Sequence, residues 1–320
     1  MTYLDQFGWK GSRPNAILGR VVKEFQHIYH VITDHTGERL ETKVTGQFRH
    51  AAKNNADYPV VGDFVTLKQE THNHPYFINS VLPRQNKLSR KHKHYNNQEQ
   101  VIVSNVDIAI VMISAQGYRQ DNHTRLNRFI HLAVNANITP IVILNKTDLV
   151  DDPGALISTL TPLISPYSVL PMQAKFNRGT DDIDGFITNG QTGIIIGMSG
   201  VGKSTLVNAL MKQSVQAVHD VRDKDFKGMH TTRNRELFQL PSGGLIIDTP
   251  GIKALSLWET EFDNSITTKD SRFDSILETA TQCKFSNCTH QHEPKCAVKL
   301  AVENGVINSS LFALYLKSTH

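Results

Sequence analysis

The stretch Gly193–Thr205, with the sequence GIIIGMSGVGKST, decides the fold of this 320-residue chain. Its apolar first half predicts a buried strand, and Gly197–Ser204 matches the pattern G-x-x-x-x-G-K-[ST] where a helix should begin. Such glycines let backbone N–H groups converge on phosphate oxygens, and the helix N-terminus adds a favourable dipole. A chance match in a chain of this length has a probability on the order of one in a hundred. The residues expected to bind nucleotide phosphates are Gly197, Met198, Ser199, Gly200, Val201, Gly202, Lys203, Ser204 and Thr205.

A second motif completes the phosphate end of this expected site. Asp248-Thr249-Pro250-Gly251 ends the apolar segment LIID and matches D-x-x-G. We expect Lys203 to neutralise the β- and γ-phosphates, Ser204 to ligate Mg²⁺, and Asp248 to hold that ion through water. The Gly251 N–H would then contact the γ-phosphate. Taken alone, this motif has a plain alternative, a strand-ending turn made of Pro and Gly.

The polar, glycine-punctuated segment 223–233 lies between these two motifs and has the composition of a mobile switch. Thr231 or Thr232 is the candidate second Mg²⁺ ligand and γ-phosphate sensor. Ile252 follows the D-x-x-G motif where related enzymes place a glutamine that orients the attacking water, and isoleucine cannot do this. His230 is therefore the candidate catalytic substitute. The alternative is an ordinary solvated histidine in a loop.

A third motif, Asn145-Lys146-Thr147-Asp148, follows the apolar segment 138–145 and matches N-K-x-D. The Asp148 carboxylate can accept hydrogen bonds from guanine N1–H and the 2-amino group, which adenine lacks. Asn145 can meet the O6/N7 edge, and the Lys146 stem can lie over the ring. A solvated strand-end loop is the alternative for four residues alone. A phosphate loop in the same region makes guanine binding the stronger interpretation.

The order of the three motifs along the chain predicts an unusual connectivity. Ordinary GTPases have the phosphate loop first and the guanine motif late, whereas here position 145 precedes 197 and 248. Apolar segments at 106–114, 138–145, 167–172 and 193–197 alternate with helical patterns, which is typical of a doubly wound α/β sheet. We therefore expect a circularly permuted α/β P-loop domain, tolerated because domain termini often lie close together.

The first 85 residues predict a different unit, a small β-barrel. Five β-rich segments are expected to form strands of an oligonucleotide-binding (OB) type barrel, although other five-stranded barrels share the pattern; they span 16–25, 27–33, 39–46, 61–68 and 76–82. Residues 1–95 hold 14 basic and 8 acidic side chains, within a chain of net charge +4. The segment Arg84–Tyr95 has no acid. This charge favours a nucleic-acid partner, and a solvated basic linker is the alternative.

The three cysteines of the chain indicate a metal site near its end. Cys283, Cys288 and Cys296, together with His290, form a Cys₃His set whose closed tetrahedral shell suits a structural Zn²⁺. His292 competes with His290 as fourth ligand, and three free buried cysteines are the alternative. So few clustered cysteines, no apolar run of about 20 residues and no secretory signal lead us to expect a cytoplasmic protein without membrane contact.

With these motifs, the chain resembles the RsgA (YjeQ) family of circularly permuted GTPases. The resemblance rests on Val61-Gly62-Asp63, Leu144–Leu149, the phosphate loop, the switch Gly228–Thr232, D-T-P-G, and the string Cys288–Val298. It implies an OB-type RNA-binding barrel (1–85), a basic linker (86–100), a permuted GTPase domain (101–258) and a mainly helical zinc domain (259–320). Two departures stand out. Met172-Gln173-Ala174-Lys175 has Gln173 where the family has serine, and Asn127 replaces a common aspartate.

The family further implies a GTPase of late small (30S) ribosomal subunit maturation. Its members bind the small subunit and its rRNA, turn GTP into GDP with Mg²⁺, and are stimulated by that subunit. His230 matches the family's proposed catalytic histidine and Thr232 its switch threonine. We expect a monomer. Two rivals remain open: a nucleotide-gated RNA-binding module in which hydrolysis is incidental, and an ATPase that uses the same loop.

Overall fold

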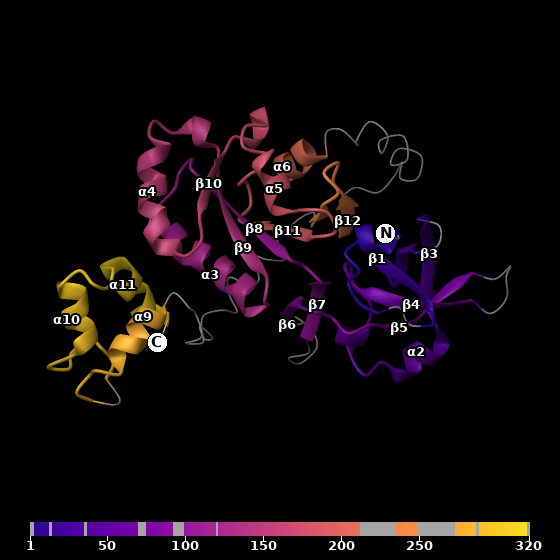
Figure 1. Ribbon diagram of the computed structural model, residues 1–320, viewed down its shortest axis with the longest axis horizontal. Helices are drawn as coiled ribbons and strands as arrows, with labels where there is room; N and C mark the ends of the chain where they lie inside the picture. The colour runs from indigo at the N-terminus through magenta and orange to yellow at the C-terminus, as the bar shows by residue number, and fades with distance from the viewer. Residues whose placement is uncertain are drawn as a thin grey trace.

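The computed structural model describes residues 3–12, 15–34, 37–69, 75–91, 99–119, 121–211, 235–248, 273–285 and 288–318. Figure 1 shows three parts in a row, with a β-barrel at one end, an α/β unit in the middle and a helical unit at the other end. Several predicted residues lie outside the described residues, namely His230, Thr231, Thr232, Gly251 and Ile252. Within the described part, no helix is long and apolar enough to cross a membrane.

The predicted five-stranded barrel is present. Its strands are β1 (Ile17–Phe25), β2 (Ile28–Thr33), β3 (Arg39–Val44), β4 (Phe64–Gln69) and β5 (Tyr76–Val81). Antiparallel pairs join β1 to β2, β2 to β3 and β4 to β5, a parallel pair joins β3 to β5, and β4 pairs with β1 to close the barrel. Helix α1 (Tyr3–Gln6) precedes the barrel, and α2 (Gly46–Ala51) and the short η1 (Asn55–Asp57) separate β3 from β4. Alternate strand residues fill its core, including Val21, Tyr29, Val31, Val65 and Ile78.

The basic segment expected to act as a linker (86–100) is folded where the structure describes it. Strand β6 (Lys87–Lys91) pairs antiparallel with β7 (Glu99–Ser104), and residues 92–98 lie outside the described residues. Lys87 Nζ lies 2.7 Å from Glu99 Oε2 across this pair. The segment predicted as a basic linker therefore contains a strand that pairs with the strand after it.

The central unit is an α/β sheet, as predicted. Strands β10 (Val169–Met172), β9 (Thr139–Asn145), β8 (Ile108–Ser114), β11 (Thr192–Gly197) and β13 (Leu245–Asp248) are parallel and lie in that order, followed by antiparallel β12 (Glu236–Gln239). Helices α3 (Asp121–Asn135) and α4 (Pro153–Ile164) contribute to the core on one face. Helices α5 (Asp182–Phe186) and α6 (Lys203–Leu210) contribute to the other. Burial on both faces explains the continuous apolar runs in the sequence.

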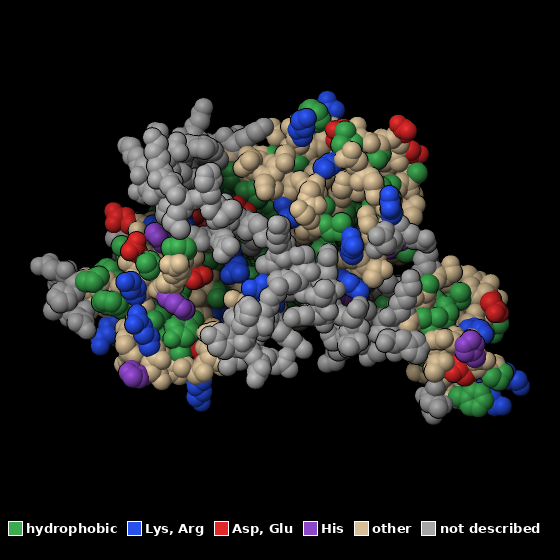
Figure 2. Space-filling model, turned by 180° about the vertical axis from the view of Figure 1, so that it is seen from behind, with side chains coloured by type: hydrophobic (Ala, Val, Ile, Leu, Met, Phe, Trp, Pro, Cys, Tyr) green, Lys and Arg blue, Asp and Glu red, His purple; other side chains and the backbone are tan. Residues whose placement is uncertain are grey.

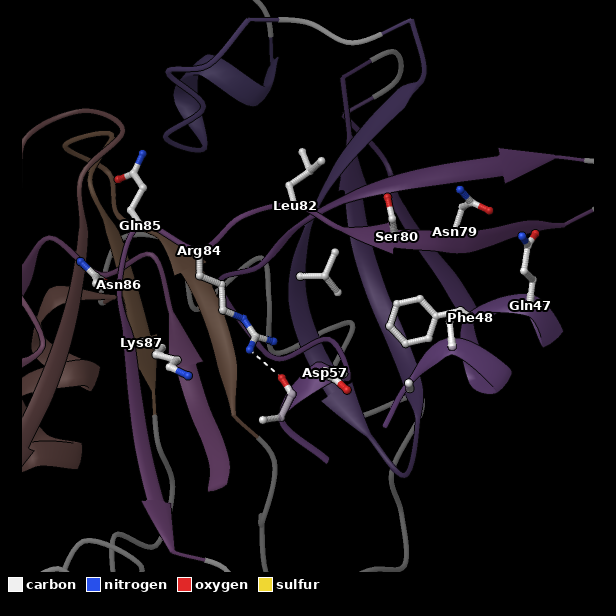
Figure 3. A pocket seen from close by; sticks show the side chains of 14 residues that line it. Gln47, Phe48, Asp57, Asn79, Ser80, Leu82, Arg84, Gln85, Asn86 and Lys87 are labelled. Atoms are coloured by element: carbon white, nitrogen blue, oxygen red, sulfur yellow. Dashed lines mark hydrogen bonds between the residues drawn. The ribbon is translucent and has the colours of Figure 1, made fainter. Parts of the chain in front are cut away.

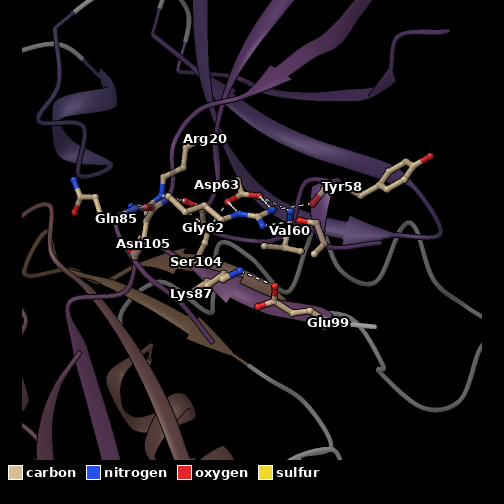
Figure 4. Close-up of polar contacts among 12 residues, drawn as sticks. Arg20, Tyr58, Val60, Gly62, Asp63, Gln85, Lys87, Glu99, Ser104 and Asn105 are labelled. Carbon is tan, nitrogen blue, oxygen red and sulfur yellow. Dashed lines mark hydrogen bonds and ion pairs between the residues drawn. The ribbon is translucent and has the colours of Figure 1, made fainter. Parts of the chain in front are cut away.

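The barrel and the α/β unit share one sheet, which the sequence did not predict. Strand β1 pairs antiparallel with β12, with Lys23 opposite Glu236, so eleven strands form a continuous sheet. A buried polar joint supports this connection (Figure 4). There, the guanidinium of Arg20 donates to the carbonyl oxygens of Phe7, Gly62 and Asn105 at 2.6, 3.2 and 3.0 Å. Burial lowers the pKa of Arg20 to about 10, which leaves it charged at neutral pH.

The C-terminal unit has a small core of its own. Helices α9 (Asp274–Ala280), α10 (Ala297–Glu303) and α11 (Ser309–Ser318) pack around Phe273, Ile276, Val298, Ile307 and Tyr315. Cys296 is part of this core, and Cys283 and Cys288 pack against it. The described part of the unit is helical, as predicted.

Candidate functional site

The phosphate loop leaves β11 and enters α6 at the carboxyl edge of the parallel sheet. Gly197 has φ +148°, and a Cβ atom there would lie 2.3 Å from the Met112 carbonyl oxygen. Gly202 has φ +104°, and a Cβ atom there would lie 2.3 Å from Asn145 Nδ2. Both positions therefore require glycine for steric reasons as well as for backbone conformation. These close approaches fix the loop against strands β8 and β9.

Lys203, the first residue of α6, folds back over the loop. Its Nζ donates to the carbonyl oxygens of Gly197 and Met198 at 2.8 and 2.5 Å. Burial lowers the pKa of Lys203 to about 8, because a low-dielectric surrounding disfavours the ammonium form. The next residues, Ser204 and Thr205, are exposed, so their hydroxyl groups are accessible at the start of the helix.

Asn145 connects the predicted base motif to the phosphate loop. Its buried amide donates from Nδ2 to the Val201 carbonyl oxygen at 2.8 Å and accepts at Oδ1 from Ala174 N–H at 3.0 Å. Two segments that are far apart in sequence, 145–148 and 197–204, are thus in direct contact. The sequence motif assigns Asn145 only to the base edge. Its role as a bridge between the two loops depends on backbone atoms of distant residues, which the motif does not reveal.

The other residues of the base motif lie in a short turn beyond β9. Lys146 has φ +62° and precedes the helical turn η2 (Thr147–Leu149), in which Asp148 is exposed. Thr147 Oγ1 donates to the Met172 carbonyl oxygen at 3.1 Å and fastens this turn to the end of β10. The Asp148 carboxylate is therefore presented to solvent by a turn that the buried Thr147 anchors.

The divergent segment Met172–Lys175 lies beside the base motif. Gln173 precedes the helical turn η3 (Ala174–Phe176), and its backbone N–H donates to the Arg178 carbonyl oxygen at 3.0 Å. The Ala174 N–H, rather than a side chain, makes the contact to Asn145. Replacement of the usual serine by Gln173 is therefore compatible with this contact. Asn127, the second departure, is buried in α3.

Asp248 brings a carboxylate to the same edge of the sheet. It ends β13, which runs parallel to and beside β11. Ser204 lies in the first turn of α6, the helix that follows β11, so a carboxylate and a hydroxyl group come from the ends of two adjacent strands. Hard oxygen donors of this kind are those that Mg²⁺ prefers, and the residues present fit such an ion.

The four predicted zinc ligands form one cluster. The candidate ligand atoms of Cys283, Cys288, His290 and Cys296 all lie within 4.8 Å of one another. The Cys283 and Cys296 Sγ atoms are 3.8 Å apart, and His290 Nδ1 lies 3.6 and 3.3 Å from them. A tetrahedral ion with Zn–S bonds of about 2.3 Å separates two sulfurs by about 3.8 Å. The donor set and its spacing fit zinc.

This geometry distinguishes between the two candidate histidines. His290 faces the cysteines through Nδ1, and His292 is not a member of the cluster. Burial raises the pKa of the Cys283 thiol, but the backbone N–H groups of Val298 and Ala297 lower this pKa by a larger amount. The net shift is downward and favours the thiolate, which is the form that binds a metal. The start of α10 thus contributes to the site electrostatically.

A separate hollow of about 780 Å³ lies on the barrel (Figure 3). Phe48 and Leu82 line it, with Arg84 at its centre and Lys87 at one end. No predicted nucleotide or metal residue lies among the residues that line it.

Arg84, counted above among the cations expected to meet a polyanion, is bound inside the protein. It forms two hydrogen bonds of 2.8 and 2.7 Å to the buried Asp63 carboxylate and two more to the carbonyl oxygens of Ala56 and Tyr58. Other basic side chains remain on the barrel surface, as Figure 2 shows at the left of its view. The exposed ones include Lys43, Arg49, Lys53 and Lys68.

A glycine-rich phosphate loop, joined by Asn145 to an N-K-x-D turn at the carboxyl edge of a parallel sheet, defines a P-loop nucleotide-binding protein. The sequence model of the RsgA GTPase family matches residues 81–258. The chain therefore belongs to the RsgA GTPase family, as its sequence motifs predicted.

Individual relatives extend this match over nearly the whole chain. "Small ribosomal subunit biogenesis GTPase RsgA 2" of Lactiplantibacillus plantarum is 35% identical, over 94% of this chain and 82% of its own. RsgA 1 of Oceanobacillus iheyensis is 36% identical, over 94% and 84%. Among solved structures, YjeQ from Thermotoga maritima has a TM-score of 0.66 at 27% identity and covers 94% of this chain and 96% of its own. YloQ, described as a circularly permuted GTPase, has the same TM-score at 26% identity and covers 97% and 96%.

Proposed function

We propose that this protein hydrolyses GTP and acts in the biogenesis of the small ribosomal subunit. Relatives that share about a third of their residues with it carry that function in their names. The observation that carries the proposal is the Asn145 bridge, since it connects a guanine-type motif to a phosphate loop at 2.8 Å. A nucleotide held at both ends by 145–148 and 197–205 is the ligand that this arrangement fits.

Each part of the site has a proposed role in this reaction. Asp148 accepts the two guanine donors, and the loop N–H groups with Lys203 hold the phosphates. Ser204 and Asp248 hold Mg²⁺, which when bound neutralises phosphate charge and orients the β- and γ-phosphates. His230, Thr232 and Gly251 keep the roles expected from the sequence, as water-orienting residue, second magnesium ligand and phosphate sensor.

The flanking units provide attachment to RNA in this proposal. Residues 1–85 form an OB-type barrel whose exposed lysines and arginines contact rRNA, with salt-sensitive affinity. Residues 259–320 form a zinc module in which Cys283, Cys288, His290 and Cys296 hold one Zn²⁺ and order a unit with a small core. The nucleotide unit, residues 101–258, lies between them.

Stimulated hydrolysis tests the proposal. Purified small subunits should raise the GTP turnover of the full chain, and large subunits at equal concentration should leave it at the basal rate. His230→Ala should remove the stimulation while GTP binding persists, which separates an enzyme from a nucleotide-gated binding module. Equal turnover with both subunits would contradict the proposed partner.

The base specificity needs its own test. Asp148→Asn removes the acceptor of two guanine donors and should move selectivity from guanine toward xanthine nucleotides, measured by competition binding. Asp151→Asn, a nearby acid outside the motif, is the matched control and should keep guanine selectivity. Unchanged guanine selectivity in the Asp148 variant would refute the assignment of 145–148 as the base site.

A further inference from the structure

A row of polar and charged residues crosses five strands, from the α/β sheet into the barrel. Its members, each opposite the next in the strand register, are Asp248 on β13, Glu236 on β12, Lys23 on β1, His30 on β2 and Glu41 on β3. Direct partners on neighbouring antiparallel strands place their side chains on the same face of a sheet. The row therefore starts at the carboxylate proposed to hold magnesium and ends on an exposed strand of the barrel.

Glu236 is the point at which the two units meet by charge. Its Oε1 accepts a hydrogen bond from Arg39 Nη1 at 2.6 Å, and its Oε2 lies 3.1 Å from Lys23 Nζ. Only 14% of the Glu236 side chain is exposed. Burial raises its pKa, but Arg39 and Lys23 lower the pKa by a larger amount, so that the net shift is downward. Glu236 is therefore ionised directly opposite Asp248, and two barrel cations compensate its charge.

Distance decides which charges of the row act on Asp248. Neighbouring strands lie about 4.8 Å apart, so Glu236 is one strand from Asp248 and Glu41 is four strands away, about 19 Å. The Debye length is about 8 Å at physiological ionic strength. The charge of Glu236 therefore acts on Asp248, whereas that of Glu41 is screened. Like charges on directly opposed residues repel, and removal of a compensating cation increases the negative potential at Asp248.

We propose that Glu236 is a positioning residue that transmits the charge state of the barrel to the magnesium-binding edge of the nucleotide site. The inference rests on the proposed function, since it assigns Asp248 to Mg²⁺. Arg39 is 38% exposed, so an RNA phosphodiester can reach it. A phosphate that takes Arg39 from Glu236 leaves more negative charge beside Asp248 and strengthens magnesium binding. Occupancy of the barrel and metal affinity are thereby coupled.

Opposite charge changes on the two sides of one ion pair test this coupling. The readout is the Mg²⁺ concentration that half-maximally slows release of a fluorescent GDP from the full chain, which requires no turnover. Glu236→Gln should raise this concentration by about tenfold to a hundredfold, the effect of one unit charge on a divalent ion at about 6 Å with an effective dielectric constant of about 40 to 80. Arg39→Gln should lower it. The matched controls are Glu41→Gln, in the same row, and Lys43→Gln, on the same strand; both should match the wild type.

The sign of the two shifts separates charge transmission from simple structural support. Both variants break the same ion pair, so a merely structural role shifts the magnesium dependence of both in one direction, and that result, or no shift, would overturn the inference. Glu236→Asp keeps the charge and should restore most of the wild-type value. If Arg39→Gln does not fold, Lys23→Gln removes the other compensating cation and should lower the half-maximal Mg²⁺ concentration. A wild-type chain with no magnesium-dependent GDP retention would instead contradict the proposed function.

Discussion

Lys203 should make nucleotide binding depend on pH in a range where an ordinary lysine does not titrate. Burial lowers its pKa from 10.5 to about 8. Only the ammonium form neutralises phosphate charge, so the apparent dissociation constant for GDP rises by the factor 1 + 10^(pH − pKa). From pH 7 to pH 9 this is about a tenfold loss of affinity, whereas a lysine with its ordinary pKa would change it by only about 3%. Affinity is therefore present below pH 8 and lost above it.

Fluorescence titration with a GDP analogue between pH 6.5 and 9.5 measures this profile. Lys203→Arg is the matched control because the arginine guanidinium stays protonated over the whole pH range. Any pH dependence that this variant shows comes from titration of the nucleotide itself. The ratio of the two dissociation constants should rise about tenfold between pH 7 and pH 9. Parallel profiles for the two proteins would show that burial of Lys203 does not set its protonation, and the reasoning from its contacts would fail.

Three further predictions concern the steric fit of the phosphate loop, the buried ion pair of Asp63 with Arg84, and the metal. Gly202→Ala places a Cβ atom 2.3 Å from Asn145 Nδ2 at φ +104°, so GDP affinity should fall by at least tenfold in the same titration, while Gly185→Ala, in open space, should have no effect. Asp63→Ala leaves Arg84 half-buried without its carboxylate and should lower the free energy of unfolding by about 3–5 kcal/mol, measured with urea; a loss below about 1 kcal/mol would contradict a buried pair. Cys296→Ser should reduce bound zinc from one ion per chain to none by elemental analysis and unfold the C-terminal helices, while GDP binding persists.

The sequence predicts the central sheet well because each parallel strand is buried on both faces. Segment 193–197 corresponds to β11 (Thr192–Gly197), and segment 138–145 to β9 (Thr139–Asn145). A continuous apolar run that ends in turn residues is a local signal, and it needs no knowledge of distant partners. The pairing of β1 with β12 has no such signal, since Lys23 and Glu236 are polar residues more than 200 positions apart.

The residues of the candidate site could be predicted where one short segment contains them, but contacts between distant segments could not. Residue types at fixed spacing identified the phosphate loop, the base motif and the zinc ligands, because each depends on chemistry within one short segment. Spacing could not distinguish His290 from His292, since only the folded backbone shows which imidazole faces the cysteines. Nor could it reveal that Arg84 is bound to Asp63, because a basic residue in a basic segment has the same appearance whether it is free or buried.

The reversed motif order is compatible with this site because the site depends on where strands end and not on the order in which they are connected. Strands β9, β8, β11 and β13 lie side by side in parallel, so their carboxyl ends meet at one edge whichever strand comes first in the chain. Asn145 then reaches Val201 across that edge. Strand β12, which is antiparallel and at the side of this sheet, is the strand that the barrel extends. The barrel is thereby connected to the strand that lies beside Asp248.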